Sequence, residues 1–312
     1  MKITIESWAP EYGSPLESGE MEEPEVPTDL EVELPVAEWH PISPSPDTPP
    51  PAAIHFVDGV RRIDARVWIT PDDDGTQLGI CASYAAGVVR CAARAEVIDT
   101  QVRRTVISTS GTPALPTRAG RFEPYAVVED SIDKLISGLQ RRLGSLEVEV
   151  AARNDPGDAL VVLDGPISWG RDQISGALGY VKTHQRSYLP ADLAKVVSQL
   201  RPGERTPIFL TETRLNRYSW YLKLPGGEGH SWSGVVRCEA LAEGELQKFR
   251  ALADQTARVL PGYASEQHKE PRAPQNLYPI SELERELRRR LGDAYYISRE
   301  LKRSARTHSE AG

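Results

Sequence analysis

Two segments of the sequence place an aspartate directly after a short apolar run and directly before a glycine. Residues 53–59 contain Asp58 and residues 159–165 contain Asp164. A continuous apolar run of this length is typical of a strand buried on both faces. If the two strands are neighbours, both carboxylates lie at one edge of the core, where divalent cations bind oxygen ligands on rigid elements. Asp-Gly is also a strong hairpin signal, so a plain turn is the alternative for each segment.

A helix before the second aspartate offers a third carboxylate. Its apolar residues recur at helical spacing: Ile132, Leu135, Ile136, Leu139, Leu143 and Leu146. Glu147 lies four residues after Leu143 and continues the buried face, where a carboxylate is costly without a partner. Glu149 should then face solvent. Alternatively, the helix has already ended, and residues 146–150 form an alternating strand that exposes both glutamates. Three such carboxylates would suit two-metal hydrolysis of a phosphodiester with Mn²⁺ or Mg²⁺.

Composition excludes several classes of protein. The 312 residues allow one large domain or two small ones. The chain has no apolar run of about 18 residues, which argues against a membrane span, and its first residues lack the apolar core of a signal peptide. The cysteines, Cys81, Cys91 and Cys238, form no Cys-x-x-Cys pair. This favours a reducing cytoplasm and argues against a zinc site.

The negative charge is concentrated at the N-terminus. Residues 1–50 hold 12 acidic side chains and one lysine, so the rest of the chain carries a net charge of +3. Residues 1–52, rich in Pro, Glu and Ser, are therefore expected to form an extended acidic arm, and residues 53–312 the folded domain. The arm could bind a partner or mimic DNA, and a solvated linker is the alternative; residues 1–8 could add an edge strand.

The order of the remaining elements predicts a mixed sheet with helices packed on it. Strands are expected at 60–70, 77–91, 95–108, 159–164, 178–183, 207–211, 219–224 and 234–240, with a loop at 109–121. Helices are expected from about residue 128 to 154 and at 191–200, 243–260 and 281–306.

Two clusters of residues could contact DNA. Arg217, Tyr218, Trp220 and Tyr221 alternate a cation with aromatic rings, a pattern suited to stacking on single-stranded bases, although aromatic residues on a strand are more often core. Arginines on the last predicted helix could follow a DNA backbone, or could pair with the glutamates between them: Arg285, Arg288, Arg289 and Arg290.

Several of these segments together resemble one family. They are residues 56–59 (Phe-Val-Asp-Gly), 146–147 (Leu-Glu), 163–168 (Leu-Asp-Gly-Pro-Ile-Ser), 179–184 (Gly-Tyr-Val-Lys-Thr-His), 201–207 and 219–225. Their order and spacing over about residues 50–295 resemble the NurA nuclease family, and the fourth segment together with the third is the most specific part of the likeness.

The resemblance implies an RNase H-like α/β fold and a Mn²⁺-dependent nuclease, with Mg²⁺ as the alternative ion and two ions in each site. It implies 5′–3′ exonuclease and single-strand endonuclease activity on DNA, in a homodimer that works with a hexameric HerA-type ATPase in end resection and repair. By motif, Asp58, Glu147 and Asp164 are the metal ligands. Lys182 would contact the scissile phosphate, and His184 would assist in binding DNA; for both, a plain surface side chain is the alternative.

The family pattern near the C-terminus is only partly present. Tyr278-Pro279 matches, but the position of the family's histidine is occupied by Glu286, which is counted among the expected catalytic residues although an exposed helix residue is its alternative. A glutamate can bind Mn²⁺ but cannot donate a proton as an imidazolium does at neutral pH. This departure supports one rival function, a NurA-like platform that binds DNA and translocase but has lost turnover. A second rival is an RNase H-like enzyme that acts on RNA.

Overall fold

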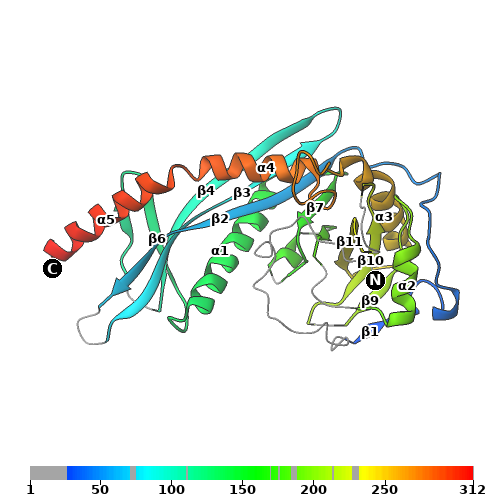
Figure 1. The fold of residues 1–312 in the computed structure, drawn as a ribbon, viewed down its shortest axis with the longest axis horizontal. Helices are drawn as coiled ribbons and strands as arrows, with labels where there is room; N and C mark the ends of the chain where they lie inside the picture. Colours follow the sequence, from blue (N-terminus) through cyan, green and yellow to red (C-terminus); the bar gives the residue numbers. More distant parts are fainter. Residues whose placement is uncertain are drawn as a thin grey trace. The chain divides into compact units, whose positions relative to one another are not determined.

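The computed structural model of the chain describes residues 27–70, 75–109, 112–168, 170–174, 176–183, 188–212, 214–226 and 232–311 (Figure 1). Its strands are β1 Thr28–Asp29, β2 Ile54–Ile69, β3 Gln77–Cys91, β4 Ala95–Ser108, β5 Leu115–Thr117, β6 Gly120–Ala126, β7 Leu160–Asp164, β8 Leu178–Val181, β9 Phe209–Thr211, β10 Arg217–Lys223 and β11 Val235–Leu241. Its helices are α1 Ile132–Arg153, α2 Ala191–Gln199, α3 Leu246–Val259, α4 Tyr278–Arg290 and α5 Ala294–Ala311, with short 3-10 helices η1 Val36–Glu38, η2 Arg171–Gln173 and η3 Leu260–Tyr263.

The strands form a large mixed sheet. Within the described residues, eleven strands follow the order β1-β9-β10-β11-β8-β7-β2-β3-β4-β6-β5. β7 pairs with β8 in parallel and β4 with β6 in parallel, whereas β8, β11, β10 and β9 pair successively as antiparallel neighbours. The predicted mixed sheet with flanking helices is confirmed, and this arrangement is compatible with an RNase H-like fold.

By their internal contacts, the residues form two compact units. The first unit comprises Met1–Phe56, Arg90–Ala95 and Pro156–Ser281, and the second comprises Val57–Val89, Glu96–Asp155 and Glu282–Gly312.

In the first unit, α2 and α3 pack on opposite faces of the strands. Tyr221 of β10 belongs to the apolar cluster that contains α2 residues and Trp39. Its neighbour Trp220, on the other face, donates a hydrogen bond from Nε1 to Thr256 Oγ1 of α3 at 3.1 Å. The ring of Tyr218 packs at a tilt against that of Phe249 of α3, with ring centroids 4.7 Å apart. The strand alternation therefore decides which helix each aromatic ring contacts.

Residues 27–52 contact the rest of the first unit through a buried ionic cluster. The guanidinium of Arg205 lies 2.8 Å from a carboxylate oxygen of Glu33 and 2.8 Å from one of Asp254, and the Arg205 side chain is 2% exposed. Glu33 also accepts a hydrogen bond from the Ile208 amide at 2.7 Å. These contacts, with the burial of Trp39, show that a solvated linker is the wrong interpretation of residues 27–52. Residues 1–8, where an edge strand was expected, lie outside the described residues.

In the second unit, α1 and α5 also cover opposite faces of the strands (Figure 1). Val106 of β4 packs in an apolar cluster with Ile297 and Leu301 of α5. The next residue, Ile107, approaches Gly138 of α1, where an added Cβ would lie 3.3 Å from its side chain. The apolar stripe of α1 therefore packs as its helical spacing predicts.

Two predicted elements and one alternative are wrong in detail. β2 runs without a break through Asp58, so Asp58-Gly59 is not a hairpin turn. The predicted loop at 109–121 contains β5 and the start of β6. The helix predicted at 281–306 is two helices, because Gly292 adopts φ +83° just after α4, a conformation that commonly ends helices at glycine.

The Arg205 cluster generates a stability prediction. Arg205→Met would leave the Glu33 and Asp254 carboxylates without their central cation, so we expect the free energy of unfolding to fall by about 3–5 kcal/mol in urea denaturation. The control is Lys195→Met, which removes an ion pair with Asp192 in which both side chains are more than 70% exposed, and which should cause no measurable change. Equal effects of the two substitutions would contradict the stabilising role of the cluster.

Candidate metal centre

Asp164, the last residue of β7, has a cation on one carboxylate oxygen. Lys182 Nζ lies 2.6 Å from Asp164 Oδ2, and the two side chains are 11% and 14% exposed. Lys182 also donates a hydrogen bond to Asn276 Oδ1 at 2.8 Å. Asp164 Oδ1 is buried and has no hydrogen-bond partner among the residues described. Lys182 is therefore not a solvated lysine at the end of a strand, and Asp164 keeps one oxygen for a further ligand.

The backbone around Asp164 is held in place by Arg171. This buried side chain donates hydrogen bonds from Nη1 to the carbonyl oxygens of Asp164, at 2.8 Å, and Pro166, at 3.3 Å. The Gly165 amide donates to the Tyr180 carbonyl at 2.8 Å. Gly165 adopts φ +95°, a conformation that favours glycine, where the chain leaves β7.

Asp58 lies within β2 and is 6% exposed. Its Oδ1 accepts a hydrogen bond from the Gly59 amide at 2.7 Å. A Cβ atom at Gly59 would lie 2.5 Å from the Leu143 side chain and 2.8 Å from Glu147 Oε1. Glycine follows Asp58 because α1 packs so closely on β2, and a turn is not the reason.

Glu147 is on the buried face of α1, as its helical phase predicts. It is 2% exposed. Glu149 is 40% exposed and forms ion pairs with Arg103 at 2.6 Å and Arg153 at 3.6 Å. The alternative of an alternating strand over residues 146–150 is wrong, because α1 continues to Arg153. Burial lowers the pKa of the nearby Arg61 guanidinium, and the negative charge of Glu147 acts in the opposite direction.

One group of carboxylates has the spacing of a metal site. Asp58, Asp164 and Glu284 each offer one oxygen, and these three oxygens all lie within 4.8 Å of one another. Asp58 and Glu284 are buried and Asp164 is partly buried. Three such carboxylates could hold a metal ion, and an all-oxygen set suits Mg²⁺ or Mn²⁺. Glu147 is not a member of this group.

Glu284, which lies on α4, was not among the site residues expected from the sequence. Its burial could have been predicted from its helical spacing relative to apolar residues, as was done for Glu147. Glu284 is four residues after Ile280 and three before Leu287, and both of these apolar side chains are fully buried. A carboxylate in phase with a buried apolar stripe signals a partner or a ligand.

Glu286, in the position of the family's histidine, does not have the properties of a proton donor. It forms ion pairs with Arg289 at 2.8 Å and Arg290 at 2.6 Å. Hydrogen bonds from these arginines lower the pKa of Glu286 to about 2. The carboxylate therefore stays ionised at neutral pH. The interpretation of Glu286 as a surface helix residue is favoured over a catalytic role, and its ion pairs are the ordinary pairing expected of these arginines.

Two of the residues expected to stack on bases are not on the surface. Trp220 is 0% exposed and Tyr221 1%, so both are core residues. Arg217 lies 3.2 Å from the buried carboxylate of Glu239. His184 lies outside the described residues. Tyr278 is the first residue of α4, and the Lys269 ammonium lies 5.6 Å from the centre of its ring.

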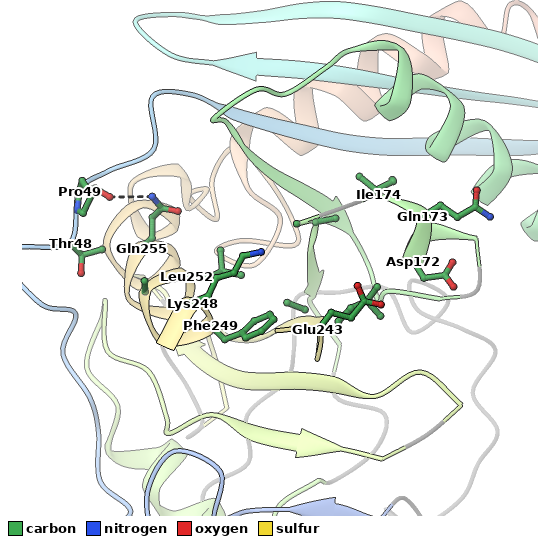
Figure 2. A pocket seen from close by; sticks show the side chains of 15 residues that line it. Thr48, Pro49, Asp172, Gln173, Ile174, Glu243, Lys248, Phe249, Leu252 and Gln255 are labelled. Carbon is green, nitrogen blue, oxygen red and sulfur yellow. Dashed lines mark hydrogen bonds between the residues drawn. The ribbon is translucent and has the colours of Figure 1, made fainter. Parts of the chain in front are cut away.

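A separate pocket lies in the first unit, beside α3 (Figure 2). Lys248, Phe249 and Leu252 line one side of it, and Asp172 and Ile174 lie opposite. None of the predicted site residues lines this pocket. Its lining does not supply a cluster of carboxylates comparable with that around Asp164.

Within the part of the chain that the structure describes, no helix has the length and apolarity of a membrane span.

No curated protein matches the chain. The family model described as the NurA domain matches residues 54–289, which include Asp58, Glu147, Asp164 and Glu284. This match covers most of the chain, and the chain therefore belongs to the NurA family of nucleases.

Proposed function

We propose that this protein is a divalent-metal-dependent nuclease that hydrolyses phosphodiester bonds of DNA. The observation that carries the proposal is the approach of one oxygen each from Asp58, Asp164 and Glu284 to within 4.8 Å of one another. Membership of a nuclease family supplies the reaction class.

The residues present fit a hard cation. All three groups are carboxylates, and Asp164 Oδ1 is a buried oxygen without a hydrogen-bond partner among the described residues. Like charges this close destabilise one another unless a cation or a proton is shared between them. Zinc fits less well, because the three cysteines are free and buried, and burial raises the pKa of Cys91 to about 11 and that of Cys81 to about 12.

We assign the ligand role to Asp58, Asp164 and Glu284, and we keep Glu147 as a ligand of a second ion. Bound Mn²⁺ or Mg²⁺ would supply Lewis-acid chemistry, activating water and neutralising charge on the phosphate. Lys182 holds a positive charge 2.6 Å from Asp164 Oδ2, which suits it to stabilise negative charge that develops on the phosphate oxygens. Tyr278 is proposed to donate a hydrogen bond from its phenol to the substrate.

Finer features of the proposal come from family membership. We propose Mn²⁺ as the preferred ion, two ions in each site, and 5′–3′ exonuclease and single-strand endonuclease activity on DNA. We further propose a homodimer that works with a hexameric HerA-type ATPase in end resection and repair. The free, buried cysteines support a reducing, cytoplasmic location. We also propose that residues 1–52 form an acidic arm and residues 53–312 the nuclease domain.

The two aspartates provide the first test. We expect Asp58→Asn and Asp164→Asn each to lower Mn²⁺-dependent cleavage of single-stranded DNA by at least about a hundred-fold, because each removes a charged ligand oxygen. The matched control is Asp192→Asn, an exposed aspartate of the first unit, which should retain full activity. Undiminished cleavage by the Asp58 variant would contradict the site.

Two glutamates on α1 test the role of Glu147. Mn²⁺ should raise the melting temperature of the unaltered protein, because it binds the folded state only. We expect Glu147→Gln to reduce this Mn²⁺-dependent shift and to slow cleavage. Glu149→Gln, on the exposed face of the same helix, should leave both unchanged. If the two variants behave alike, Glu147 has no part in binding metal.

Two glutamates on α4 test which of them, Glu284 or Glu286, belongs to the metal site. We expect Glu284→Gln to lower cleavage at least about ten-fold through weaker metal binding. Glu286→Gln should retain cleavage, because that carboxylate only pairs with Arg289 and Arg290. The reverse order would restore Glu286 as the functional residue.

Two outcomes would support the rival functions. If the unaltered protein cleaves nothing with Mn²⁺, Mg²⁺ or Co²⁺ but still stimulates the translocase, it is a non-catalytic platform. If it prefers RNA to DNA, it is the RNase H-like enzyme that acts on RNA.

A further inference from the structure

Glu239 is a carboxylate that the catalytic proposal does not use, and its side chain is fully buried in the first unit. It lies on β11 with a side-chain exposure of 0%. Its Oε2 lies 2.8 Å from Arg237 Nη1, and its Oε1 lies 3.2 Å from Arg217 Nη1. Oε1 also accepts a hydrogen bond from the Ile167 amide at 2.7 Å. The last contact connects this ionic cluster to the loop that follows Asp164.

Arg217 also binds the backbone of Ile167. Its Nη1 donates a hydrogen bond to the Ile167 carbonyl at 3.1 Å. The amide and the carbonyl of Ile167 are therefore bound by two charged partners that also bind each other. Ile167 is three residues after Asp164 and is 1% exposed.

Side chains pack tightly around this cluster at Gly179. Glu239 lies opposite Gly179 in the β8–β11 register. A Cβ atom at Gly179 would lie 2.9 Å from Glu239 Cγ and 3.0 Å from Ile167 Cγ1. Glycine at position 179 thus permits the carboxylate and the loop to meet across β8, which is a direct reason for the Gly179-Tyr180 sequence.

We infer that Glu239 and Arg217 are positioning residues that fix the loop 165–168 and, through it, the direction of the Asp164 carboxylate. The inference rests on the proposed function of Asp164 as a metal ligand. Arg171 binds the carbonyls of Asp164 and Pro166, so charge-assisted hydrogen bonds hold the backbone at Asp164, Pro166 and Ile167. Arg217 thereby has a role in orienting the site and not in stacking on DNA.

The energetics of burial support a positioning role. A buried ionic cluster often adds little stability compared with apolar residues of the same volume, because each ion loses its hydration. Its geometric effect is larger, because Glu239 Oε1 accepts hydrogen bonds from the Ile167 amide and from Arg217 Nη1, and such bonds form only in fixed directions. Arg237 is further oriented by the ring of Tyr188, whose centre lies 4.4 Å from its guanidinium carbon.

The test compares two arginines of the first unit that have matching contacts. Arg217 pairs with the buried Glu239 and donates to the Ile167 carbonyl, whereas Arg250 lies 3.6 Å from the buried Glu33 and donates to the Glu33 carbonyl at 2.9 Å. We would measure hydrogen exchange of the Ile167 amide and Mn²⁺ affinity for the full chain with Arg217→Met, Arg250→Met and Glu239→Gln. The last variant keeps the shape of Glu239 and removes its charge.

We expect Ile167 to exchange at least about ten-fold faster in Arg217→Met and Glu239→Gln, because the loop opens more often, and Mn²⁺ to bind several-fold more weakly. Arg250→Met should change neither quantity. Equal Ile167 exchange in Arg217→Met and Arg250→Met would overturn the inference, as would unchanged Mn²⁺ affinity in both loop variants. If the unaltered protein binds no Mn²⁺ while Ile167 still exchanges faster in the loop variants, the metal function fails and the anchoring of the loop stands.

Discussion

The cost of burying carboxylates is the constraint on which the structure of the site depends. Asp58 is 6% exposed, Glu147 2% and Glu284 8%, and each lies on a strand or helix that also buries apolar side chains. A buried carboxylate is tolerated when a cation or strong hydrogen-bond donors compensate its charge. The chain uses one strand and two helices to bring these groups into the interior, and a bound divalent cation would compensate several of them at once.

The first unit meets the same constraint with its own cations. Glu33 is paired with Arg205, Glu239 with Arg217 and Arg237, and Asp164 with Lys182. Two of these pairings fix segments that have little regular secondary structure. Glu33 attaches residues 27–52 to the rest of the first unit, and Glu239 attaches the loop after Asp164. Ionic contacts thus determine where irregular backbone lies, whereas apolar alternation determines how the strands and helices pack.

Much of this was predictable from periodicity, and the exceptions have physical reasons. The helical phase of α1 placed Glu147 on the buried face, and the bounds of β3 and β4 followed from their alternation. Asp58-Gly59 matches the sequence signal of a hairpin turn, but the glycine is explained by the close approach of Leu143 and Glu147. Glu284 had the same phase signal as Glu147, but the alternation of Glu and Arg around it resembles a solvated helix face. The contacts of Arg217 with Glu239 and Ile167 join residues far apart in the sequence, so no local pattern could indicate them.

The most direct measurement of the central claim is anomalous diffraction from crystals grown with Mn²⁺. The account predicts an anomalous peak with carboxylate oxygens of Asp58, Asp164 and Glu284 at about 2.0–2.2 Å, the range for small divalent cations on oxygen. Lys182 should remain beside Asp164. A Mn²⁺ peak elsewhere, or none next to Asp164 at saturating Mn²⁺, would contradict the assignment of this site as the metal centre of a nuclease.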